Sequence, residues 1–461
     1  MRSAAVLLLT AALAACAQTR PYERPPAPVP QVWPEPASGT RQADAIGWRE
    51  FFTDPRLRSL VAAALEHNRD LRIALARVEE ARAAAGLARA ERVPAIEGQA
   101  SGSRSRVPGD RSFGFATRAR NVSRYDVGLG ITAYELDFWG RVARLDEAAR
   151  AQLMAAEHAR RAFHIGLVAA VADTWLGTLE LAEREALAAH SLAAREATRT
   201  LVARRREAGV SSELDVLAAE AAASAARVQA AELARQRTAA ENALQLLTGM
   251  ETVATPGWPL AAQDLLADFA PGLPSEVLLR RPDVMAAEER LVAAHASVAA
   301  ARAAFFPRVV LTASLGTASA ALSGLFGAGS HAWAFQPVLR APLFDGGRTQ
   351  ANIDLAEARK DTAVAEYERA IQQAFREVAD ALASRTHLAR ELAAQQANAA
   401  SQRERLAKVE ARQRAGIANY LEVLDAQREA FAADQTLVAL RRQHLSAGIA
   451  LYKALGGGVS K

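Results

Sequence analysis

One stretch of the sequence occurs twice, and this repeat limits what the chain can fold into. AGVSSELDVLAAE, at Ala208–Glu220, returns 207 positions later as AGIANYLEVLDAQR, at Ala415–Arg428. In both copies a Gly follows a run of basic residues, which is typical of a helix C-terminus. A capping-box pattern then begins a new helix in each copy, with Ser212 and Asp215 in the first and Asn419 and Glu422 in the second. Each copy therefore predicts the tip of a helical hairpin.

A second set of matches extends the repeat toward the start of each half. At an offset of 213 positions, identical residues pair as Asp70 with Asp283, Arg77 with Arg290, and Pro94 with Pro307. The chain is therefore interpreted as an internal duplication. The first repeat is predicted at residues 41–250 and the second at 282–461, with a linker at 251–281 between them.

Long helical patterns lead up to both tips. Residues 140–207 and 347–414 predict two matching helices, each about 100 Å long at about 1.5 Å per residue. Residues 212–248 and 419–455 predict the two returning helices. Neither long pattern has an interior Pro, and a sustained amphipathic pattern of this length indicates coiled-coil-like packing. Nearer the N-terminus, Trp48–Leu65 predicts one short helix and Asp70–Arg92 a clearer one.

Between the helices, the pattern changes to the alternation of β-strands. Strands are predicted at about 95–137 and 308–344, two in each half. In the clearest strand the apolar face is predicted to carry Tyr125, Val127, Leu129, Ile131 and Ala133. Tyr134 and the small or polar residues between them are predicted on the other face.

Such strands suit an outer-membrane barrel, with one face toward lipid. Four strands cannot close a barrel, because a stable lumen needs roughly eight. A barrel must therefore be shared between chains, and three chains would give 12 strands. A small soluble sheet packed on the helices is the alternative.

The N-terminus has the features of a lipoprotein signal. Residues 1–15 combine a basic start with an apolar stretch that is too short to span a bilayer. Cys16, the only cysteine in the chain, follows Leu13-Ala14-Ala15 as in a lipobox, which predicts acylation and a lipid anchor. An ordinary signal peptide with an incidental Cys is the alternative. No other apolar run of 18 residues is present in the sequence, so no helical membrane span is expected.

Residues 16–40 join this anchor to the folded region. The stretch Arg20–Pro36 contains seven prolines, which predicts an extended, semi-rigid spacer. A ligand for a proline-binding module is the alternative interpretation.

Charge and motif patterns argue against several functions. The net charge is +5, but the sequence has no block of basic residues of the kind that binds along a phosphate backbone. No nucleic-acid partner is therefore expected. The eight histidines have no zinc-ligand spacing, and no nucleophile elbow or phosphate-binding loop is present. The chain is therefore predicted not to be an enzyme and to need no cofactor or metal.

Six motifs, in order along the mature chain, resemble the TolC-like outer-membrane efflux protein family. They are similar in particular to the lipoprotein, NodT-type subfamily that serves resistance-nodulation-division multidrug pumps. The motifs are YELDFWGR at 134–141, GLPSEVLLRRPDVMAAE at 272–288, ARAAFFP at 301–307, LSGLFGAGS at 322–330, NYLEVLDAQR at 419–428 and LYKALGGG at 451–458. The residue after the cysteine is Ala17 and not Asp, and in this respect the chain is similar to lipoproteins that are sorted to the outer membrane.

This resemblance implies an α+β membrane protein that works as a homotrimer. Its implied architecture is a 12-stranded outer-membrane β-barrel that continues into a long periplasmic α-helical barrel. The implied function is a passive exit duct for drugs or other small molecules in a tripartite efflux system. Its implied partners are a periplasmic adaptor and an inner-membrane resistance-nodulation-division pump, besides outer-membrane lipid.

A periplasmic lipoprotein adaptor without a channel is the competing interpretation. Adaptors are also rich in Ala and contain helical hairpins, but they have a single hairpin between two halves of a small β-domain. Two hairpins in tandem and strands with an apolar face favour the channel.

The resemblance also implies a periplasmic gate just after the second tip. Threefold symmetry would bring Leu421, Glu422 and Asp425 toward one axis, where Asp425 would form a ring of carboxylates that binds cations. Asp215 is the counterpart of Glu422 at the first tip, and both positions also suit a helix cap. The adaptor contact is expected at the turns themselves, at Ala208, Gly209, Val210, Ala415, Gly416 and Ile417.

Overall fold

The structure, a computed structural model, describes residues 21–34, 46–109, 119–250, 259–266 and 274–457. These residues form two compact units, each assembled from segments far apart in the sequence. Unit 1 takes its described residues from Met1–Pro26, Arg77–Ala156 and Ala286–Tyr367. Unit 2 takes them from Ala27–Ala76, Glu157–Met285 and Glu368–Lys461.

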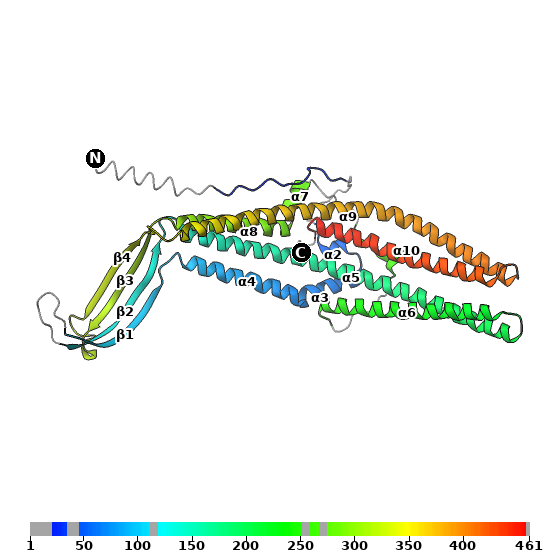
Figure 1. Cartoon of the computed structure of the whole chain (residues 1–461), viewed down its shortest axis with the longest axis horizontal. Helices are drawn as coiled ribbons and strands as arrows, with labels where there is room; N and C mark the ends of the chain where they lie inside the picture. The colour runs from blue at the N-terminus through cyan, green and yellow to red at the C-terminus, as the bar shows by residue number, and fades with distance from the viewer. Residues whose placement is uncertain (1–20, 35–45, 110–118, 251–258, 267–273, 458–461) are drawn as a thin grey trace. The chain divides into compact units, whose positions relative to one another are not determined.

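Unit 1 contains one four-stranded antiparallel sheet in the order β1-β2-β3-β4 (Figure 1). Its strands are β1 (Ile96–Val107), β2 (Arg120–Leu136), β3 (Arg308–Ser319) and β4 (His331–Arg340). A short turn of 3-10 helix, η4 (Leu322–Gly324), follows β3. The four predicted strands are confirmed. They pair as one sheet because β2 of the first half lies beside β3 of the second.

The predicted alternation along β2 is wrong at its end. Ile131 pairs with Ala313 and Tyr134 with Leu311, so β2 has one more residue than β3 between these pairs. This β-bulge places Ala133 in the left-handed region, at φ 58°. Tyr134 therefore lies on the same face as Ile131, not on the opposite one. The sequence has no Gly at this bulge that would indicate it.

The pairing register separates two chemically different faces, because residues paired across strands point to the same side. We call one of them the apolar face; it carries Ile96, Tyr125, Val127, Leu129, Ile131, Tyr134, Val309, Leu311, Leu315, Trp333, Phe335 and Leu339. The other, the small face, carries Ser101, Ser103, Gly128, Gly130, Ser314, Gly316, Ala332 and Ala334. On the small face a Cβ at Gly316 would lie 2.5 Å from the Cα of Gly128, so β2 and β3 approach closely there.

The helices of unit 1 pack through small side chains. They are parts of α4 (Arg69–Ala90), α5 (Arg141–Glu207), α8 (Pro282–Ala303) and α9 (Arg348–Arg414). Ala148 and Ala151 of α5 form a buried cluster with Ala293 and Ala296 of α8. Alanines at a contact allow two helix backbones to approach closely, which explains how an Ala-rich, aromatic-poor chain builds a packed interior.

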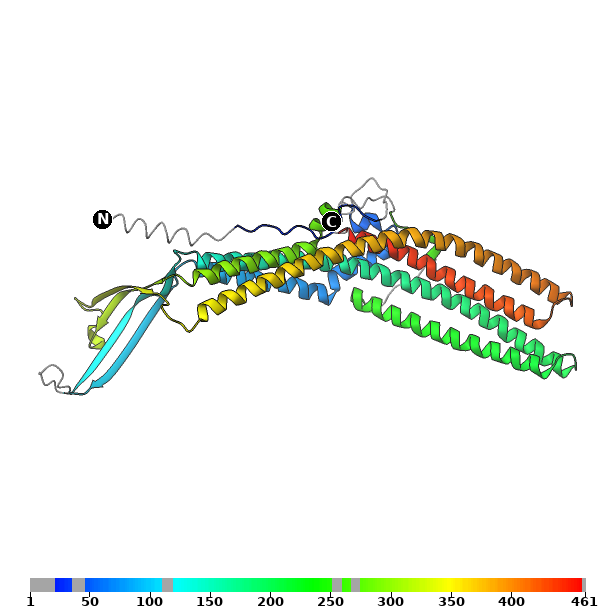
Figure 2. The ribbon, with the colours of Figure 1, turned by 45° about the horizontal axis from the view of Figure 1, so that its top comes forward.

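Unit 2 contains the two helical hairpins, α5–α6 and α9–α10, with both tips at the same end (Figure 2). The remaining helices are α2 (Trp48–Phe51), α3 (Pro55–His67), α6 (Glu213–Thr248), η3 (Leu260–Ala262), α7 (Pro274–Arg280) and α10 (Tyr420–Ala454). The predicted long and returning helices are confirmed to within one residue at the tips. The single helix predicted at Trp48–Leu65 is wrong.

That segment breaks into α2 and α3 at Asp54. The carboxylate of Asp54 caps α3 by accepting a hydrogen bond from the Arg56 amide at 2.8 Å, and Pro55 takes the first helical position. Asp54 also accepts a hydrogen bond from the indole of the buried Trp175 at 3.3 Å. The break therefore serves to anchor the N-terminal helices on α5.

Helix α5 contains an apolar stretch long enough to cross a membrane by composition, contrary to our expectation from the sequence. In the fold 61% of that 18-residue stretch is buried inside the protein. Val168, Val171 and Trp175 are among its buried residues. The stretch is therefore apolar because it packs against other helices.

Candidate functional site

Both hairpin tips have the same backbone geometry, and it is the one predicted. Gly209 and Gly416 have φ angles of 75° and 74°, which glycine adopts without strain. The Val210 amide donates to the Arg205 carbonyl at 2.9 Å, and the Ile417 amide to the Arg412 carbonyl at 2.9 Å. This bond pattern is a Schellman C-cap. The six residues predicted to contact an adaptor are all exposed: Ala208, Gly209, Val210, Ala415, Gly416 and Ile417.

The capping boxes that follow the turns are also present. The Ser212 hydroxyl accepts from the Asp215 amide at 3.1 Å, and the Asp215 carboxylate accepts from the Ser212 amide at 2.9 Å. Asn419 and Glu422 make the same reciprocal pair, at 2.9 and 3.3 Å. Hydrogen bonds from Ser212 lower the pKa of the Asp215 carboxyl. Asp215 and Glu422 therefore cap their helices, and a gate role for either one stays a prediction.

Asp425 differs from these two acids because it lies beyond the cap and joins two helices. One carboxylate oxygen accepts from the Arg405 guanidinium of α9 at 2.8 Å, and the other from Arg428 of α10 at 2.9 Å. Its side chain is 42% exposed. Leu421, one turn before it, is 61% exposed, which is unusual for a leucine on a packed helix. The residues of the predicted gate thus reach the surface of unit 2.

Sequence reasoning did not identify Arg405 as a partner of Asp425. The two residues lie at similar distances before and after the turn, so a hairpin brings them together. This relation could have been found once the tip was placed. Arg428 is three residues after Asp425 on the same helix face, which is ordinary helix spacing for an ion pair.

Tyr420, the first residue of α10, has charged groups of the first hairpin near it. This half-buried side chain lies within electrostatic reach of Arg195 and Asp215, which belong to the first hairpin. Burial raises the pKa of the Tyr420 hydroxyl, Arg195 opposes this shift and Asp215 adds to it. Burial likewise lowers the pKa of Arg195, which donates to the Ala222 carbonyl at 3.2 Å.

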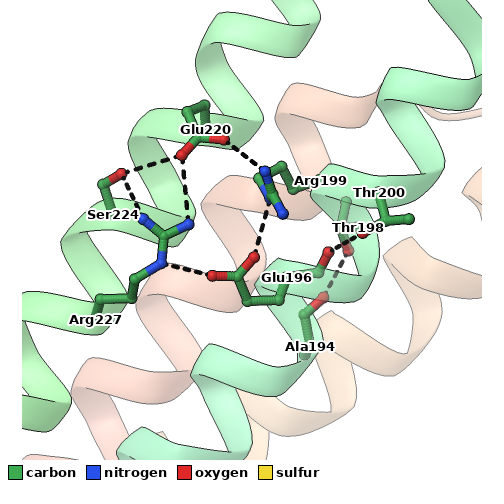
Figure 3. Close-up of polar contacts among 8 residues, drawn as sticks. All are labelled: Ala194, Glu196, Thr198, Arg199, Thr200, Glu220, Ser224 and Arg227. Carbon is green, nitrogen blue, oxygen red and sulfur yellow. Dashed lines mark hydrogen bonds and ion pairs between the residues drawn. The ribbon is translucent and has the colours of Figure 1, made fainter.

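A network of charges connects the two helices of the first hairpin (Figure 3). Glu196 on α5 accepts from Arg227 on α6 at 2.7 Å, and Arg199 on α5 donates to Glu220 on α6 at 3.1 Å. Arg227 also donates to Glu220 at 3.3 Å and to Ser224 at 3.2 Å. Charges of opposite sign alternate through the network, so each group has a partner on the facing helix.

The second hairpin has the corresponding ion pair with its charges exchanged. Arg403 and Asp434 lie 207 positions after Glu196 and Arg227, and they form an ion pair at 2.6 Å between α9 and α10. The contact between helices is thus present in both hairpins although each residue has changed sign. The second hairpin therefore serves as an internal reference for testing whether the ion pair holds the two helices together.

We expect Glu196→Arg alone to loosen the first hairpin, because it places two cations opposite each other. The second hairpin has Arg403, Leu406, Gln427 and Asp434 at the four corresponding positions. The quadruple variant Glu196→Arg, Arg199→Leu, Glu220→Gln and Arg227→Asp recreates this arrangement and should restore the contact. Hydrogen–deuterium exchange of the amides near Gly209 would measure this as lost and then recovered protection. A quadruple variant as poorly protected as the single one would contradict the pairing.

The same pairs should weaken only in acid. Hydrogen bonds from Arg227 and Arg199 lower the pKa values of Glu196 and Glu220. A carboxyl with a lowered pKa contributes its stability above its unfolded value, about 4.3 for Glu, and loses it as the pH falls through the lower folded value. The protection factors, which are exchange rates corrected for the intrinsic pH dependence of amide exchange, should therefore stay constant near neutral pH.

The apolar face of the sheet is the second candidate site. Leu129, Leu315 and Trp333 form one row across three strands and are 60%, 66% and 77% exposed. Phe335 and Leu339, the next residues along this face of β4, are 64% and 66% exposed. An apolar surface this continuous marks a membrane or protein contact.

The structure describes only part of the N-terminal segment for which a lipid anchor and a spacer are predicted. Cys16 lies outside the described residues. In unit 1, Arg24 pairs with Glu288 of α8 at 2.6 Å. In unit 2, Trp33 stacks on Phe375 of α9 with ring centroids 5.0 Å apart. The described part of the Pro-rich segment is therefore held against helices and has no regular secondary structure of its own.

Comparison with known proteins agrees with this geometry over nearly the whole chain. A family model described as outer membrane efflux protein matches residues 60–250 and again 273–457. The outer membrane protein OprJ of Pseudomonas aeruginosa is 46% identical over 456 residues, covering 98% of this chain and 95% of its own. The solvent efflux pump outer membrane protein SrpC of Pseudomonas putida is 42% identical, covering 97% and 96%.

Solved structures also resemble this chain over nearly its whole length. A membrane protein from Pseudomonas aeruginosa matches with a TM-score of 0.89 and 46% identity, over 95% of this chain and 97% of that one. The open state of the Neisseria gonorrhoeae MtrE outer membrane channel matches with a TM-score of 0.85 and 36% identity, over 96% and 98%.

Proposed function

This chain belongs to the outer membrane efflux protein family, and from that premise we propose that three copies form one continuous exit duct. The protein is an outer-membrane channel of an efflux system. What we propose in addition is the trimer, the closed barrel, the gate, the lipid anchor and the identity of the partners. The competing interpretation as an adaptor loses its support, since the relatives that cover the chain are outer-membrane proteins.

The observation that carries the trimer is the sheet with one apolar face and two open edges. Within the described residues, β1 and β4 each pair on one side only. An open edge beside an exposed apolar face would aggregate unless it is covered or closed. Three four-stranded sheets, joined β4 to β1, would make 12 strands, enough for a lumen where roughly eight are needed. The apolar face would then contact lipid and the small face would line the lumen.

The helical hairpins supply the periplasmic part of the proposed duct. Helices α5 and α9 are 67 residues each, which corresponds to about 100 Å at about 1.5 Å per residue. Their matching lengths, the matching tips and the two family-model matches support descent by internal duplication. Three chains would contribute six hairpins to a helical barrel.

The exposed turns at Gly209 and Gly416 are proposed to dock a periplasmic adaptor, which connects the duct to an inner-membrane resistance-nodulation-division pump. Their exposed apolar residues, Val210 and Ile417, support this contact. Drugs or other small molecules would pass from the pump through the duct. We propose that Cys16 is acylated and anchors the chain in the outer membrane, because it lies at the end of a signal peptide.

The gate is proposed at Leu421 and Asp425. Three exposed leucines brought to one axis would form an apolar constriction, and three aspartates a cation-binding ring. Because Asp425 is bound to Arg405 and Arg428, opening would require these pairs to break or to move together. Glu422 and Asp215 would act at the gate only through the helices that they cap.

The test combines mass and conductance on the full protein extracted in detergent. We expect a complex with the mass of three chains, a lipidated Cys16 at the N-terminus of each, and discrete channels in planar bilayers. A water-soluble monomer that gives no channels would overturn the shared barrel. Trimers whose N-terminal residue carries no lipid would overturn only the proposed lipid anchor and would leave the shared barrel standing.

A further inference from the structure

The apolar face of the sheet changes abruptly in character toward one end. Among its described residues, the only Arg, Lys, Asp or Glu side chains are Arg104 and Arg106 of β1. Both lie at the end where β1 leads into β2, far from Ile96, where β1 follows α4. Toward this end the face also carries Thr317, Ser319 and His331, in register with Val127 and Tyr125. Two cations are costly in contact with hydrocarbon, so their position requires an explanation.

The neighbours of these arginines on β2 are polar as well. Arg104 pairs in register with Ser123 and Arg106 with Asn121. Residues two apart on a strand lie about 7 Å from each other, and paired residues lie about 5 Å apart. Two guanidinium groups, a hydroxyl and an amide therefore form one compact block of hydrogen-bond donors. We call these four residues the basic block.

An aromatic residue separates the basic block from the apolar part of the face. Tyr125 pairs in register with Gly102, and its ring lies over that glycine, 3.2 Å from the position that a Cβ would take there. An aromatic ring over a strand glycine replaces the missing side-chain contact. Tyrosine is typical of the level where lipid tails meet head groups, at both edges of a membrane barrel. Tyr134, at the other end of β2, lies on the same face.

The height of the band from Tyr125 to Val309 fits a bilayer. Because of the bulge, the sheet advances eight positions from Tyr125 to Tyr134. The apolar residues continue to Val309, which is ten positions along β3 from Ser319, the partner of Tyr125. At about 3.3 Å per residue and a tilt of about 40°, this band is about 25 Å tall, the height of the apolar band of outer-membrane barrels. The basic block begins one pair beyond Tyr125, at the level of lipid head groups.

We propose that the basic block binds phosphate groups of anionic lipids in the outer leaflet. This inference rests on the proposed function, because it requires the apolar face to contact the membrane. Paired guanidinium groups match the oxygens of a phosphate with two parallel hydrogen bonds each, and Ser123 and Asn121 add neutral donors. The acyl chains of the same lipid would lie along Tyr125, Val127 and Leu129 toward the middle of the face. The described part of this face presents no carboxylate to compete for the two cations.

The test uses full-length protein in detergent micelles, titrated with dioleoyl phosphatidic acid or dioleoyl phosphatidylcholine and followed by native mass spectrometry. We expect the wild type to prefer phosphatidic acid, and Arg104→Gln with Arg106→Gln to lose this preference by roughly tenfold or more, given the attraction of each Arg to an anionic surface. Arg120→Gln is the matched control. Arg120 belongs to the same end of the sheet but lies on the small face, in register with Val107.

Two outcomes would overturn the proposal. One is a wild type that binds both lipids equally, and the other is a double variant that keeps the preference. Inorganic phosphate should not displace the lipid at equal concentration, because it lacks the acyl chains. If it does, the block is a site for free phosphate and not for lipid.

A second measurement separates this inference from the proposed function. Trp333 lies on the apolar face, and bromine atoms on lipid tails should quench its fluorescence in reconstituted protein, with Trp333→Phe removing the quenched signal. If that quenching is absent, the face does not contact lipid and both proposals fail. If quenching occurs but Arg104 and Arg106 do not affect lipid preference, only the phosphate site fails.

Discussion

Leu315→Arg is expected to remove most of the protein from the outer-membrane fraction. Leu315 is in the middle of the apolar face, between Leu129 and Trp333, and 66% of its surface is exposed. An Arg on the lipid face of a barrel costs about 2–4 kcal/mol at the bilayer midplane. A trimer would carry this cost three times, once in each chain. The total cost to assembly is therefore larger than the cost of one substitution at a water-exposed position. Density-gradient fractionation and detergent extraction of the membranes would measure it.

Ser314→Arg is the matched control for this prediction. Ser314 is the next residue on β3 but lies on the small face, in register with Gly130 and Ala334. If that face lines a lumen, the new cation contacts water, and the protein should remain in the outer membrane with altered ion selectivity. Equal loss of both variants would indicate general damage to the sheet. Normal insertion of Leu315→Arg would show that the apolar face does not meet lipid.

The parts of this fold that the sequence predicted depend on local chemistry. The two tips follow from Gly209 and Gly416 and from capping residues within three positions of each other, and the structure has these turns and caps where they were expected. The bulge at Ala133 was missed because it depends on how β2 pairs with β3, which is almost 180 residues away in sequence. The split at Asp54 was missed although Asp54 and Pro55 are a local signal for a helix start, and the hydrogen bond from Trp175, on another helix, adds to it.

The features of the candidate site also divide into those that the local sequence indicated and those that depend on contacts between distant segments. The resemblance to the family implied Leu421 and Asp425, just after the second tip, and the capping-box spacing indicated Asp215 and Glu422 as caps. The sequence did not indicate that Asp425 has two arginine partners, because Arg405 is close only once the hairpin has formed. The exchanged ion pairs, Glu196 with Arg227 and Arg403 with Asp434, were visible at the 207-residue offset, but opposite charges do not appear as matches in a search for identity.

Asp425→Ala is expected to raise the conductance of the reconstituted channel and to weaken its block by divalent cations. The substitution removes the proposed carboxylate ring and also breaks the link between α9 and α10. Because the carboxylate is 42% exposed, the pairs contribute little to folding, typically about 0.2–1 kcal/mol for exposed ion pairs. The melting temperature should therefore hardly change while the conductance rises. Single-channel recording with and without Mg²⁺ would measure both effects.

Arg405→Ala separates the two consequences of that substitution. It breaks the same link between α9 and α10 but leaves the Asp425 carboxylate in place, with less positive charge beside it. If the link holds the entrance narrow, conductance should rise in both variants. Cation block should then change in opposite directions, weaker in Asp425→Ala and stronger in Arg405→Ala, because an unpaired carboxylate attracts Mg²⁺ more strongly. Lys408→Ala, which removes an exposed ion pair within α9 alone, is the control. An Asp425→Ala channel with normal conductance and normal block would exclude this residue from the gate, and its two arginines would then only stabilise the hairpin.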